Sequence, residues 1–412
     1  MSTRYASVRA LTEALAEPLS PEDQTAQSMP DVSPTKWHRA HTTWFFEEFL
    51  LGPNVAGYAS PDPGYRYLFN SYYEAVGPRH PRVARGAVTR PGAAEVGAYR
   101  RHVDEAMGEL LSAPPGPEVC ELVELGLHHE QQHQELLLMD IKHVLAQNVL
   151  DPVYRSVPDR SAAAVPDASW VGHEGGCVLV GHDGRGFAFD NEGPQHRVWL
   201  EPFELATTPV SNAQVLEFIA DGGYGRSELW LSDGWATVQA QGWEAPLYWR
   251  SEEDGSWSSF TLSGRRAIDP AEPACHLSYY EADAIARWAG ARLPTEAEWE
   301  AVVGAAPPEH PGLDLDVLHP RPFGPEAADG ARPVVGDVWE WTSSAYLPYP
   351  GFRPAPGAVG EYNGKFMVNQ QVLRGGACVT PPGHVRATYR NFFPPASRWA
   401  FSGARLARDL EP

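Results

Sequence analysis

His129-Glu130-Gln131-Gln132-His133 lies inside Glu118–Asn148, a stretch whose apolar spacing predicts one long helix. Residues four apart share a helix face, with Cβ atoms roughly 5 to 6 Å apart, so both imidazoles can reach one ion. Two ligands do not make a site, but His38 and His41 stand upstream in Trp37–Glu48, which has the spacing of a second core-facing helix. The pattern predicts a metal site built by histidines from two helices.

The same five residues match HExxH, the zinc metalloprotease motif in which two histidines bind zinc and the glutamate is the general base. Such an enzyme needs a third ligand soon after the helix, whereas Leu136–Lys142 continues as an apolar helix without a histidine-containing turn. A zinc hydrolase that uses Glu130 is therefore the second interpretation. In a third, His129 and His133 are core side chains of a bundle.

The composition indicates a globular protein. At 412 residues and 43% hydrophobic content, the chain has room for two or three domains with well-filled cores. The four scattered cysteines lack CxxC spacing, so they predict neither a disulfide framework nor a thiolate zinc cluster. A formal charge of -21 repels phosphate backbones and anionic lipid. We therefore expect no nucleic-acid partner and no membrane partner.

The N-terminus gives an expectation about location. Met1–Pro18 lacks the basic start and apolar stretch of a signal peptide. No run of about 18 apolar residues is present to span a bilayer. Cytoplasmic residence is the expectation that follows.

Residues 1–155 contain four stretches with helical spacing, which predict a four-helix bundle. The stretches are Arg4–Ala16, Trp37–Leu51, Gly92–Ser112 and Glu118–Asn148. Between the second and third lies Gly52–Pro91, an irregular segment rich in Tyr, Arg, Gly and Pro. A connection of that length in a compact domain is usually functional or mobile.

The residue pattern of the chain changes after the predicted bundle. Asp151–Ser169 loses helical periodicity, and we place a linker at 156–169. The second domain, 170–412, has short apolar runs, frequent Gly and Pro, and abundant Trp. It contains one clear helix, Ser278–Ala289, and a second that starts after the N-cap Thr295. The predicted fold class is thus an all-α domain followed by an irregular α+β domain.

Three strings in the second domain resemble the formylglycine-generating-enzyme fold, a C-type-lectin-like superfamily, over most of residues 170–408. They are Arg292–Glu300 (RLPTEAEWE), Gly336–Trp341 (GDVWEW) and Leu373–Gly376 (LRGG). The first domain, with its histidines, resembles a DinB-type bundle. The fusion of the two resembles the sulfoxide synthases of ergothioneine biosynthesis, and this resemblance covers essentially the whole chain.

The resemblance implies an enzyme that joins the sulfur of a thiol to C2 of the imidazole of hercynine (Nα-trimethylhistidine), using O2 and non-haem Fe(II), and that leaves a sulfoxide. By position, the iron ligands fall on His41, His129 and His133. Gln132 matches the residue that hydrogen-bonds to the hercynine imidazole. Three neutral imidazoles leave open positions on Fe(II) for thiolate, substrate nitrogen and O2.

The long irregular segment contains Phe69–Glu74, which resembles the tyrosine pair of one branch of that family. The resemblance implies a catalytic role for Tyr72 or Tyr73, in which a phenol hydrogen-bonds to or protonates an oxygen species in the site. In the alternative interpretation, both are interface aromatics whose hydroxyls are satisfied by structural partners.

Near the C-terminus, Tyr389–Pro395 matches the Arg-Asn-aromatic segment of the family. This match implies that Asn391, Phe392 and Phe393 line the hercynine pocket, where aromatic rings attract a trimethylammonium group. In the branch that uses γ-glutamylcysteine an Asp follows the aromatic, and Phe stands there in this chain. The departure favours free cysteine as the thiol.

Three arginines, Arg79, Arg82 and Arg85, stand in one short loop and are candidates to bind the carboxylate of the thiol substrate through a bidentate fork. Arg82 is the best placed of them. The alternative is that they are solvated or structural, as most loop arginines are.

Two further interpretations remain beside the zinc hydrolase. A selenoneine synthase joins a selenosugar to hercynine on the same scaffold, and the iron and hercynine residues are shared. A non-enzymatic binding module, in which an inactive bundle accompanies a lectin-like domain, predicts neither stoichiometric iron nor turnover.

Overall fold

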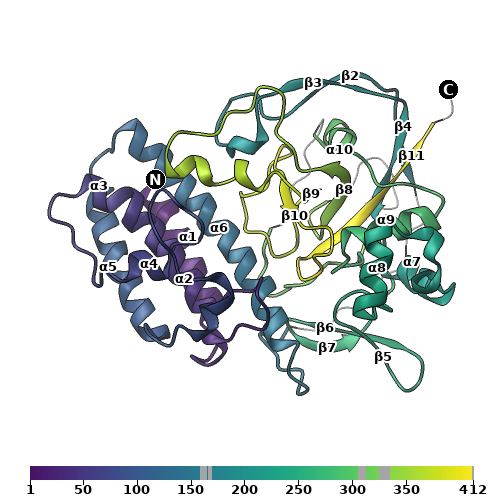
Figure 1. The fold of residues 1–412 in the computed structure, drawn as a ribbon, viewed down its shortest axis with the longest axis horizontal. Coiled ribbons are helices and arrows are strands. Elements are labelled where there is room, and N and C mark those ends of the chain that lie inside the picture. Colours follow the sequence, from purple (N-terminus) through teal and green to yellow (C-terminus); the bar gives the residue numbers. More distant parts are fainter. Residues whose placement is uncertain (158–164, 166–168, 305–311, 324–334, 411–412) are drawn as a thin grey trace. The chain divides into compact units, whose positions relative to one another are not determined.

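Four long helices form the first part of the chain: α1 (Ser2–Ala16), α2 (Thr35–Phe46), α5 (Ala93–Leu110) and α6 (Pro117–Leu145) (Figure 1). The computed structural model describes residues 1–157, 165, 169–304, 312–323 and 335–410. α2 packs against α5 and α6, and α1 packs against α6. The predicted four-helix bundle is confirmed.

The helices bury the faces that their apolar spacing predicts. On α5, Val96, Tyr99, Val103 and Met107 are buried and recur at intervals of three or four residues. The helix begins after Gly92, whose backbone N–H donates to the Glu95 carboxylate at 2.7 Å and is thereby satisfied. Local capping and the apolar stripe thus set the same helix boundary.

The connection between α2 and α5 consists of short helical turns. It follows the π-helical turn η2 (Glu47–Leu51), and contains α3 (Gly52–Asn54), α4 (Tyr65–Leu68) and the 3-10 helix η3 (Arg82–Ala87). The end of α4 is anchored to α2, because the Trp37 indole N–H donates to the Leu68 carbonyl at 3.1 Å. The segment that carries the tyrosine pair is therefore tied to the helix that carries His41.

A six-stranded mixed sheet forms the centre of the second part of the chain, in the order β1-β4-β11-β8-β9-β10. Its strands are β1 (Trp170–His173), β4 (Phe203–Pro209), β8 (Trp339–Ala345), β9 (Gln371–Arg374), β10 (Asn391–Phe393) and β11 (Ser402–Asp409). β11 and β8 pair in parallel, and the other neighbours pair antiparallel. Two smaller sheets pair β2 (Gly176–Val180) with β3 (His196–Leu200), and β5 (Trp249–Ser251) with β6 (Trp257–Thr261) and β7 (Gly264–Ala267).

The strings that carry the family resemblance lie in the core of this part. Glu340 on β8 is fully buried, and its carboxylate accepts from the Arg405 guanidinium and the Trp299 indole, each at 2.6 Å. A buried carboxylate requires such partners, because an unpaired charge in the interior is costly. Glu340 and Trp299 therefore hold the fold together.

Two helices of this part begin where the sequence predicts, and two were missed. α9 (Tyr279–Trp288) and α10 (Glu296–Val303) start after the N-caps Ser278 and Thr295, each in a capping box. α7 (Asn212–Ala220) and α8 (Ser232–Gln241) were not predicted.

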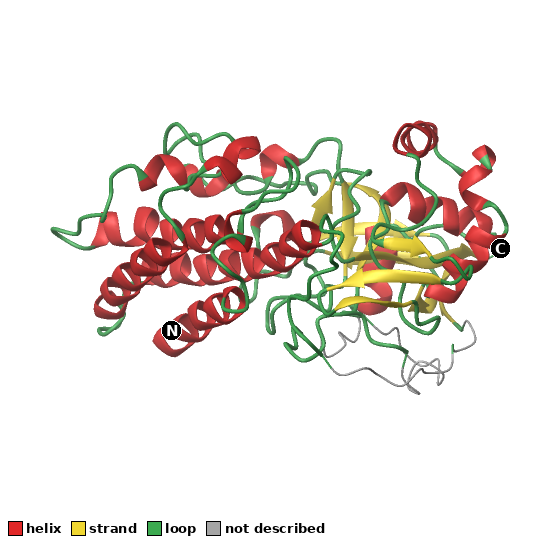
Figure 2. Ribbon diagram, turned by 90° about the horizontal axis from the view of Figure 1, so that it is seen from below, coloured by secondary structure: helices red, strands yellow, loops and turns green. Residues whose placement is uncertain are grey.

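The chain groups into two units. One contains Met1–Arg155 and Ala355–Tyr362, and the other contains Ser156–Pro354 and Asn363–Pro412. Figure 2 shows the strands, in yellow, confined to the second unit. Most of the expected linker, 158–164 and 166–168, lies outside the described residues. In the part of the chain that the structure describes, no helix has both the length and the apolar character needed to cross a bilayer.

Candidate metal centre

Three histidines from two helices of the bundle meet at one point. His129 and His133 lie one turn apart on α6, and His41 lies on α2. One ring nitrogen from each imidazole lies within 4.8 Å of the other two. Among the described residues, this is the only group of three or more His, Cys, Asp or Glu side chains placed to hold a metal ion.

Gly126 on α6 allows the two helices to approach each other next to the triad. A Cβ atom at this position would lie 2.7 Å from the Phe46 ring and 2.9 Å from the Phe45 ring, both on α2. Those distances are too short for real contacts, so any larger residue would force the helices apart. Glycine thus sets the spacing at which His41 reaches the α6 histidines.

The hydrogen bond of His41 fixes which of its nitrogens faces the triad. Its Nδ1 lies 2.6 Å from the Phe69 carbonyl oxygen, which can only accept, so Nδ1–H is the donor. The lone pair is then on Nε2, which lies 3.2 Å from the His129 Nε2. The same His41 nitrogen that lacks a proton therefore points at a second imidazole. His38, the other upstream candidate, is not in the triad and contacts His133 from outside it.

Burial keeps all three imidazoles in the neutral form that binds metals. Burial lowers the pKa of His129 to about 3. It also lowers the pKa values of His41 and His133 well below the ordinary value, and the neighbouring imidazoles lower them further. At neutral pH the triad consequently offers three uncharged nitrogen donors.

Aromatic rings surround the triad. Trp37 stacks on His41 with ring centroids 4.6 Å apart, and Trp44 stacks on His41 at 5.5 Å. Phe45 lies 4.8 Å from the His129 ring. These rings limit the access of water to the histidines and hold the imidazole planes in place.

The types of ligand atom in the triad indicate which metal ions it can bind. Among the described residues the cluster offers three neutral imidazoles and no carboxylate or thiolate. Imidazole suits iron, copper, nickel and zinc, and three ligands leave coordination positions for substrates. The residues present therefore fit a non-haem iron ion.

Gln132 and a tyrosine distant in sequence lie together beside the triad. The Tyr362 hydroxyl donates to the Gln132 side-chain oxygen. The Tyr362 ring centroid is 5.7 Å from that of His129 and 6.2 Å from that of Tyr72. Tyr362 was not predicted from the sequence, because no recognisable motif surrounds it.

Glu361, the residue before Tyr362, binds the loop that carries Tyr72 and Tyr73. The Glu361 carboxylate accepts from the backbone N–H groups of Glu74 and Ala75, at 3.0 and 2.8 Å. Ala355–Tyr362 groups with the bundle. Glu361 thus fixes this segment to the loop that carries Tyr72 and Tyr73.

Tyr72 and Tyr73 stack on each other, with ring centroids 4.7 Å apart. Tyr73 is fully buried against Trp44, and burial raises the pKa of its phenol. The loop takes this shape because the Asn70 side chain bonds to both the N–H and the carbonyl of Tyr73, each at 3.0 Å. Tyr73 is thus connected to the triad through the Trp44 ring, and Tyr72 through Tyr362.

The three loop arginines occupy different environments. Arg82 is exposed, and its guanidinium donates to the Asp31 carbonyl. Arg79 is paired with an exposed glutamate. Arg85 is buried, and its guanidinium carbon lies 3.3 Å from the centroid of the Trp37 ring. Of the three, Arg85 is the one that contacts the aromatic shell of the triad.

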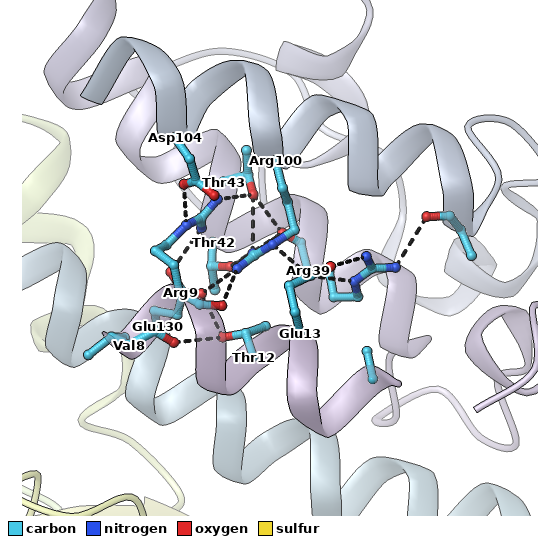
Figure 3. Close-up of polar contacts among 12 residues, drawn as sticks. Val8, Arg9, Thr12, Glu13, Arg39, Thr42, Thr43, Arg100, Asp104 and Glu130 are labelled. Carbon is cyan, nitrogen blue, oxygen red and sulfur yellow. Dashed lines mark hydrogen bonds and ion pairs between the residues drawn. The ribbon is translucent and has the colours of Figure 1, made fainter. Parts of the chain in front are cut away.

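Glu130 is fully buried and lies in a cluster of charged residues (Figure 3). Its two carboxylate oxygens accept from Arg9 and Arg100, each at 2.9 Å, and from the Thr12 hydroxyl at 2.6 Å. Burial alone would raise the pKa of Glu130, but the two guanidinium charges lower it to about 2. Both oxygens of this carboxylate are used in structural hydrogen bonds, so Glu130 is not placed to act as the general base of a zinc hydrolase.

Asn391, Phe392 and Phe393 form β10 in the second unit and are half-buried. Phe392 stacks on Tyr346 with centroids 4.0 Å apart, and Phe393 lies 5.6 Å from the Trp399 ring. The Asn391 side-chain oxygen accepts from the Phe392 N–H at 2.9 Å, which leaves its amide NH2 free of that bond. The segment therefore presents an aromatic surface with one adjacent amide.

Known proteins resemble both parts of this chain. The model of the sulfatase-modifying factor enzyme 1-like domain matches residues 155–310 and 318–410, and that of the DinB superfamily matches residues 4–137. A hercynine oxygenase from Mycolicibacterium smegmatis is 32% identical over 93% of both chains. Another, from Mycobacterium tuberculosis, is 32% identical over 100% of this chain and 99% of its own. A formylglycine-generating enzyme from Streptomyces coelicolor is 28% identical, over 55% of this chain.

Proposed function

Because this chain belongs to the family of hercynine oxygenases, we propose that it is an Fe(II)- and O2-dependent sulfoxide synthase that joins the sulfur of cysteine to C2 of the hercynine imidazole. The observation that carries the proposal is the convergence of three neutral imidazoles in a chain that resembles those enzymes along its whole length. No other cluster of three such side chains is present among the described residues.

In this proposal His41, His129 and His133 hold the iron through nitrogens that are unprotonated at neutral pH. Bound Fe(II) supplies the redox chemistry that activates O2 and the positive charge that deprotonates a bound thiol. The overall reaction balances: the C2 hydrogen and the thiol hydrogen leave as water with one oxygen atom of O2, and the other oxygen atom remains in the sulfoxide.

The residues around the triad orient and shield the substrates. Gln132, whose side-chain oxygen accepts from the Tyr362 hydroxyl, hydrogen-bonds to the hercynine imidazole through its amide group. Tyr72 or Tyr73 donates a proton within the site, where burial keeps the phenol of Tyr73 protonated. Asn391, Phe392 and Phe393 bind the amino-acid end of hercynine, with the rings against its trimethylammonium group.

The second substrate is proposed to be free cysteine. Phe393 stands where the γ-glutamylcysteine branch has Asp, so this chain lacks that partner for a glutamyl amine. The cysteine carboxylate is proposed to bind to an arginine of the loop 79–85. Arg82 is exposed and reachable from solvent, and Arg85 lies closer to the triad.

A zinc hydrolase is disfavoured by the position of Glu130. The general base of such an enzyme has to face the metal-bound water. Both oxygens of Glu130 are instead bonded to Arg9, Arg100 and Thr12.

Product analysis by mass spectrometry tests the proposal. The Fe(II)-reconstituted protein is exposed to air with hercynine and, in separate tubes, cysteine, γ-glutamylcysteine or a selenosugar. We expect a hercynyl sulfoxide with cysteine and little product with the other two. Product with the selenosugar alone would instead identify a selenoneine synthase, and no product in any tube would contradict the proposed function.

A further inference from the structure

His38 lies behind the metal-binding triad, in contact with one of its members. It is on α2, three residues before His41, and is 2% exposed. Its Nδ1 lies 2.9 Å from the Nδ1 of His133. Nothing in the proposed reaction uses this side chain, yet it forms a direct hydrogen bond to a proposed iron ligand.

The other nitrogen of His38 is bonded to a buried carboxylate. His38 Nε2 lies 3.0 Å from an oxygen of Asp140, which is 3% exposed. The same carboxylate oxygen accepts from the Ser33 backbone N–H at 2.8 Å. Asp140 is thereby fixed at the N-terminal end of α2, although it belongs to α6.

If His133 is a metal ligand, the protons along this chain of hydrogen bonds can have only one arrangement. Its Nε2 must carry the lone pair that faces the triad, so its Nδ1–H donates to His38 Nδ1. His38 Nδ1 is then an acceptor, and its proton is on Nε2, where it is donated to the Asp140 carboxylate. Each bond therefore fixes the tautomer of the next ring.

The three triad histidines differ in this respect. His41 donates to a backbone carbonyl, and among the described residues the Nδ1 of His129 has no hydrogen-bond partner. In the part of the chain that the structure describes, His133 is the triad member whose hydrogen bonds lead to a carboxylate. A metal-bound imidazole that donates to a carboxylate, here through a second ring, is oriented by that bond and becomes a stronger ligand.

We propose that His38 and Asp140 are positioning residues of the metal centre, which hold His133 in the tautomer and orientation that bind the ion. The inference rests on the proposed function, since it requires that His133 binds a metal. It adds two residues that act on the metal through His133 and do not touch the substrates.

Two substitutions of His38 separate its hydrogen bond to His133 from its hydrogen bond to Asp140, which together form the His133–His38–Asp140 relay. In His38→Asn the amide oxygen takes the place of ring Nδ1, so an acceptor for His133 is kept and the bond to Asp140 is lost. In His38→Gln the amide takes the place of ring Nε2, so the bond to Asp140 is kept and the acceptor is lost. Fe(II) affinity is measured anaerobically by competition with a chromophoric chelator, and the visible spectrum of the Co(II)-loaded protein reports the ligand geometry.

We expect His38→Gln to weaken Fe(II) binding by about 10- to 100-fold and to change the Co(II) spectrum, and His38→Asn to have the smaller effect. The matched controls are His143→Asn and His143→Gln on α6, where the ring bonds to Ser28 outside the triad, and both should keep the affinity of the unsubstituted protein. Circular dichroism checks the fold of every variant.

Equal affinities for the two His38 variants and the unsubstituted protein would overturn the inference. A greater loss in His38→Asn, which keeps the acceptor for His133, would also overturn it, because the affinity would then not depend on the bond between His38 and His133. If His38→Gln does not fold, Asp140→Asn decides: an affinity loss of about tenfold supports the relay, and an unchanged affinity overturns it. If the unsubstituted protein binds no Fe(II), the metal centre itself fails, and with it the proposed function. That result is distinct from a failure confined to His38 and Asp140.

Discussion

At the three histidines, the partner of one ring nitrogen decides what the other nitrogen can do. The Phe69 carbonyl holds the proton of His41 on Nδ1 and so directs Nε2 into the triad. His38 is only three residues away on the same helix, but its Nδ1 faces His133. Spacing alone could not choose between His38 and His41, because the choice depends on a carbonyl in the loop after α4.

At the same scale we predict the effect of removing the phenols. The variant Tyr72→Phe/Tyr73→Phe should form product about 10²- to 10⁴-fold more slowly, the usual loss when a proton donor is removed. Both single variants are measured beside it, and Fe(II) affinity serves as the control, since neither hydroxyl belongs to the triad. Undiminished turnover in the double variant would show that both tyrosines are only structural.

At the scale of the elements, the contact between α2 and α6 determines whether the triad exists. We predict that Gly126→Ala lowers the free energy of unfolding by about 1 to 3 kcal/mol, because its Cβ would press into the Phe45 and Phe46 rings. Fe(II) affinity should fall as well, since the helices that carry the ligands move apart.

The matched control is Gly108→Ala on α5, where an added Cβ meets nothing within 4 Å. That change should leave Fe(II) affinity unchanged and stabilise the helix by about 0.5 to 1 kcal/mol. Denaturant unfolding measures both variants, and equal stabilities would contradict the tight contact at Gly126.

The buried cluster around Glu130 gives a prediction with a defined pH dependence. Glu130→Gln should lower the free energy of unfolding of the metal-free protein by about 3 kcal/mol at pH 7, because Arg9 and Arg100 lose their counter-charge. The folded-state pKa, about 2, lies below the ordinary 4.5, so the stabilisation is present above pH 4.5 and is lost as the pH falls towards 2. The difference in the free energy of unfolding between Glu130→Gln and the unsubstituted protein should therefore become smaller as the pH falls from 4.5 to 2.

Fe(II) binding by Glu130→Gln separates the structural role from a catalytic one. Affinity close to that of the unsubstituted protein, together with retained turnover, is expected. Loss of turnover while the free energy of unfolding is unchanged would instead show that Glu130 takes part in catalysis.

The sequence predicts the elements well where local signals coincide. α9 and α10 follow the N-caps Ser278 and Thr295, and the bundle helices follow their apolar stripes. α7, with 9 residues, was missed although Ser211 and Gln214 form a capping box, because unlike the similarly short α10 it carries no string that resembles the family. Short helices offer too few turns for periodicity to be recognised.

At the scale of the whole chain, contacts between distant segments could not be predicted. Tyr362 and Gln132 are separated by 230 positions, and only the folded chain brings their side chains together. The three strings that resemble the formylglycine-generating-enzyme fold could be recognised in the sequence, but the roles of their residues could not. Glu340 is a fully buried partner of Arg405, so such strings indicate a core as readily as a site.

The division into two units predicts how metal affects the stability of the whole protein. Each unit has its own core, so the metal-free protein should unfold in two transitions. Fe(II) at about 100 times its Kd should stabilise only the unit that contains the triad, by about 2.7 kcal/mol. Anaerobic calorimetry with and without Fe(II) tests this, and a shift of both transitions, or a single shared one, would contradict it.

In the proposed function, the histidine triad supports an O2-dependent joining of sulfur to hercynine. The most direct test of this function is the mass of the product formed under ¹⁸O2 from cysteine and hercynine deuterated at C2, by the Fe(II)-loaded protein and by His133→Ala. We predict that the unsubstituted protein gives a sulfoxide that has lost the deuterium and gained one ¹⁸O atom, and that His133→Ala gives none. Product without ¹⁸O, or equal product from His133→Ala, would contradict it.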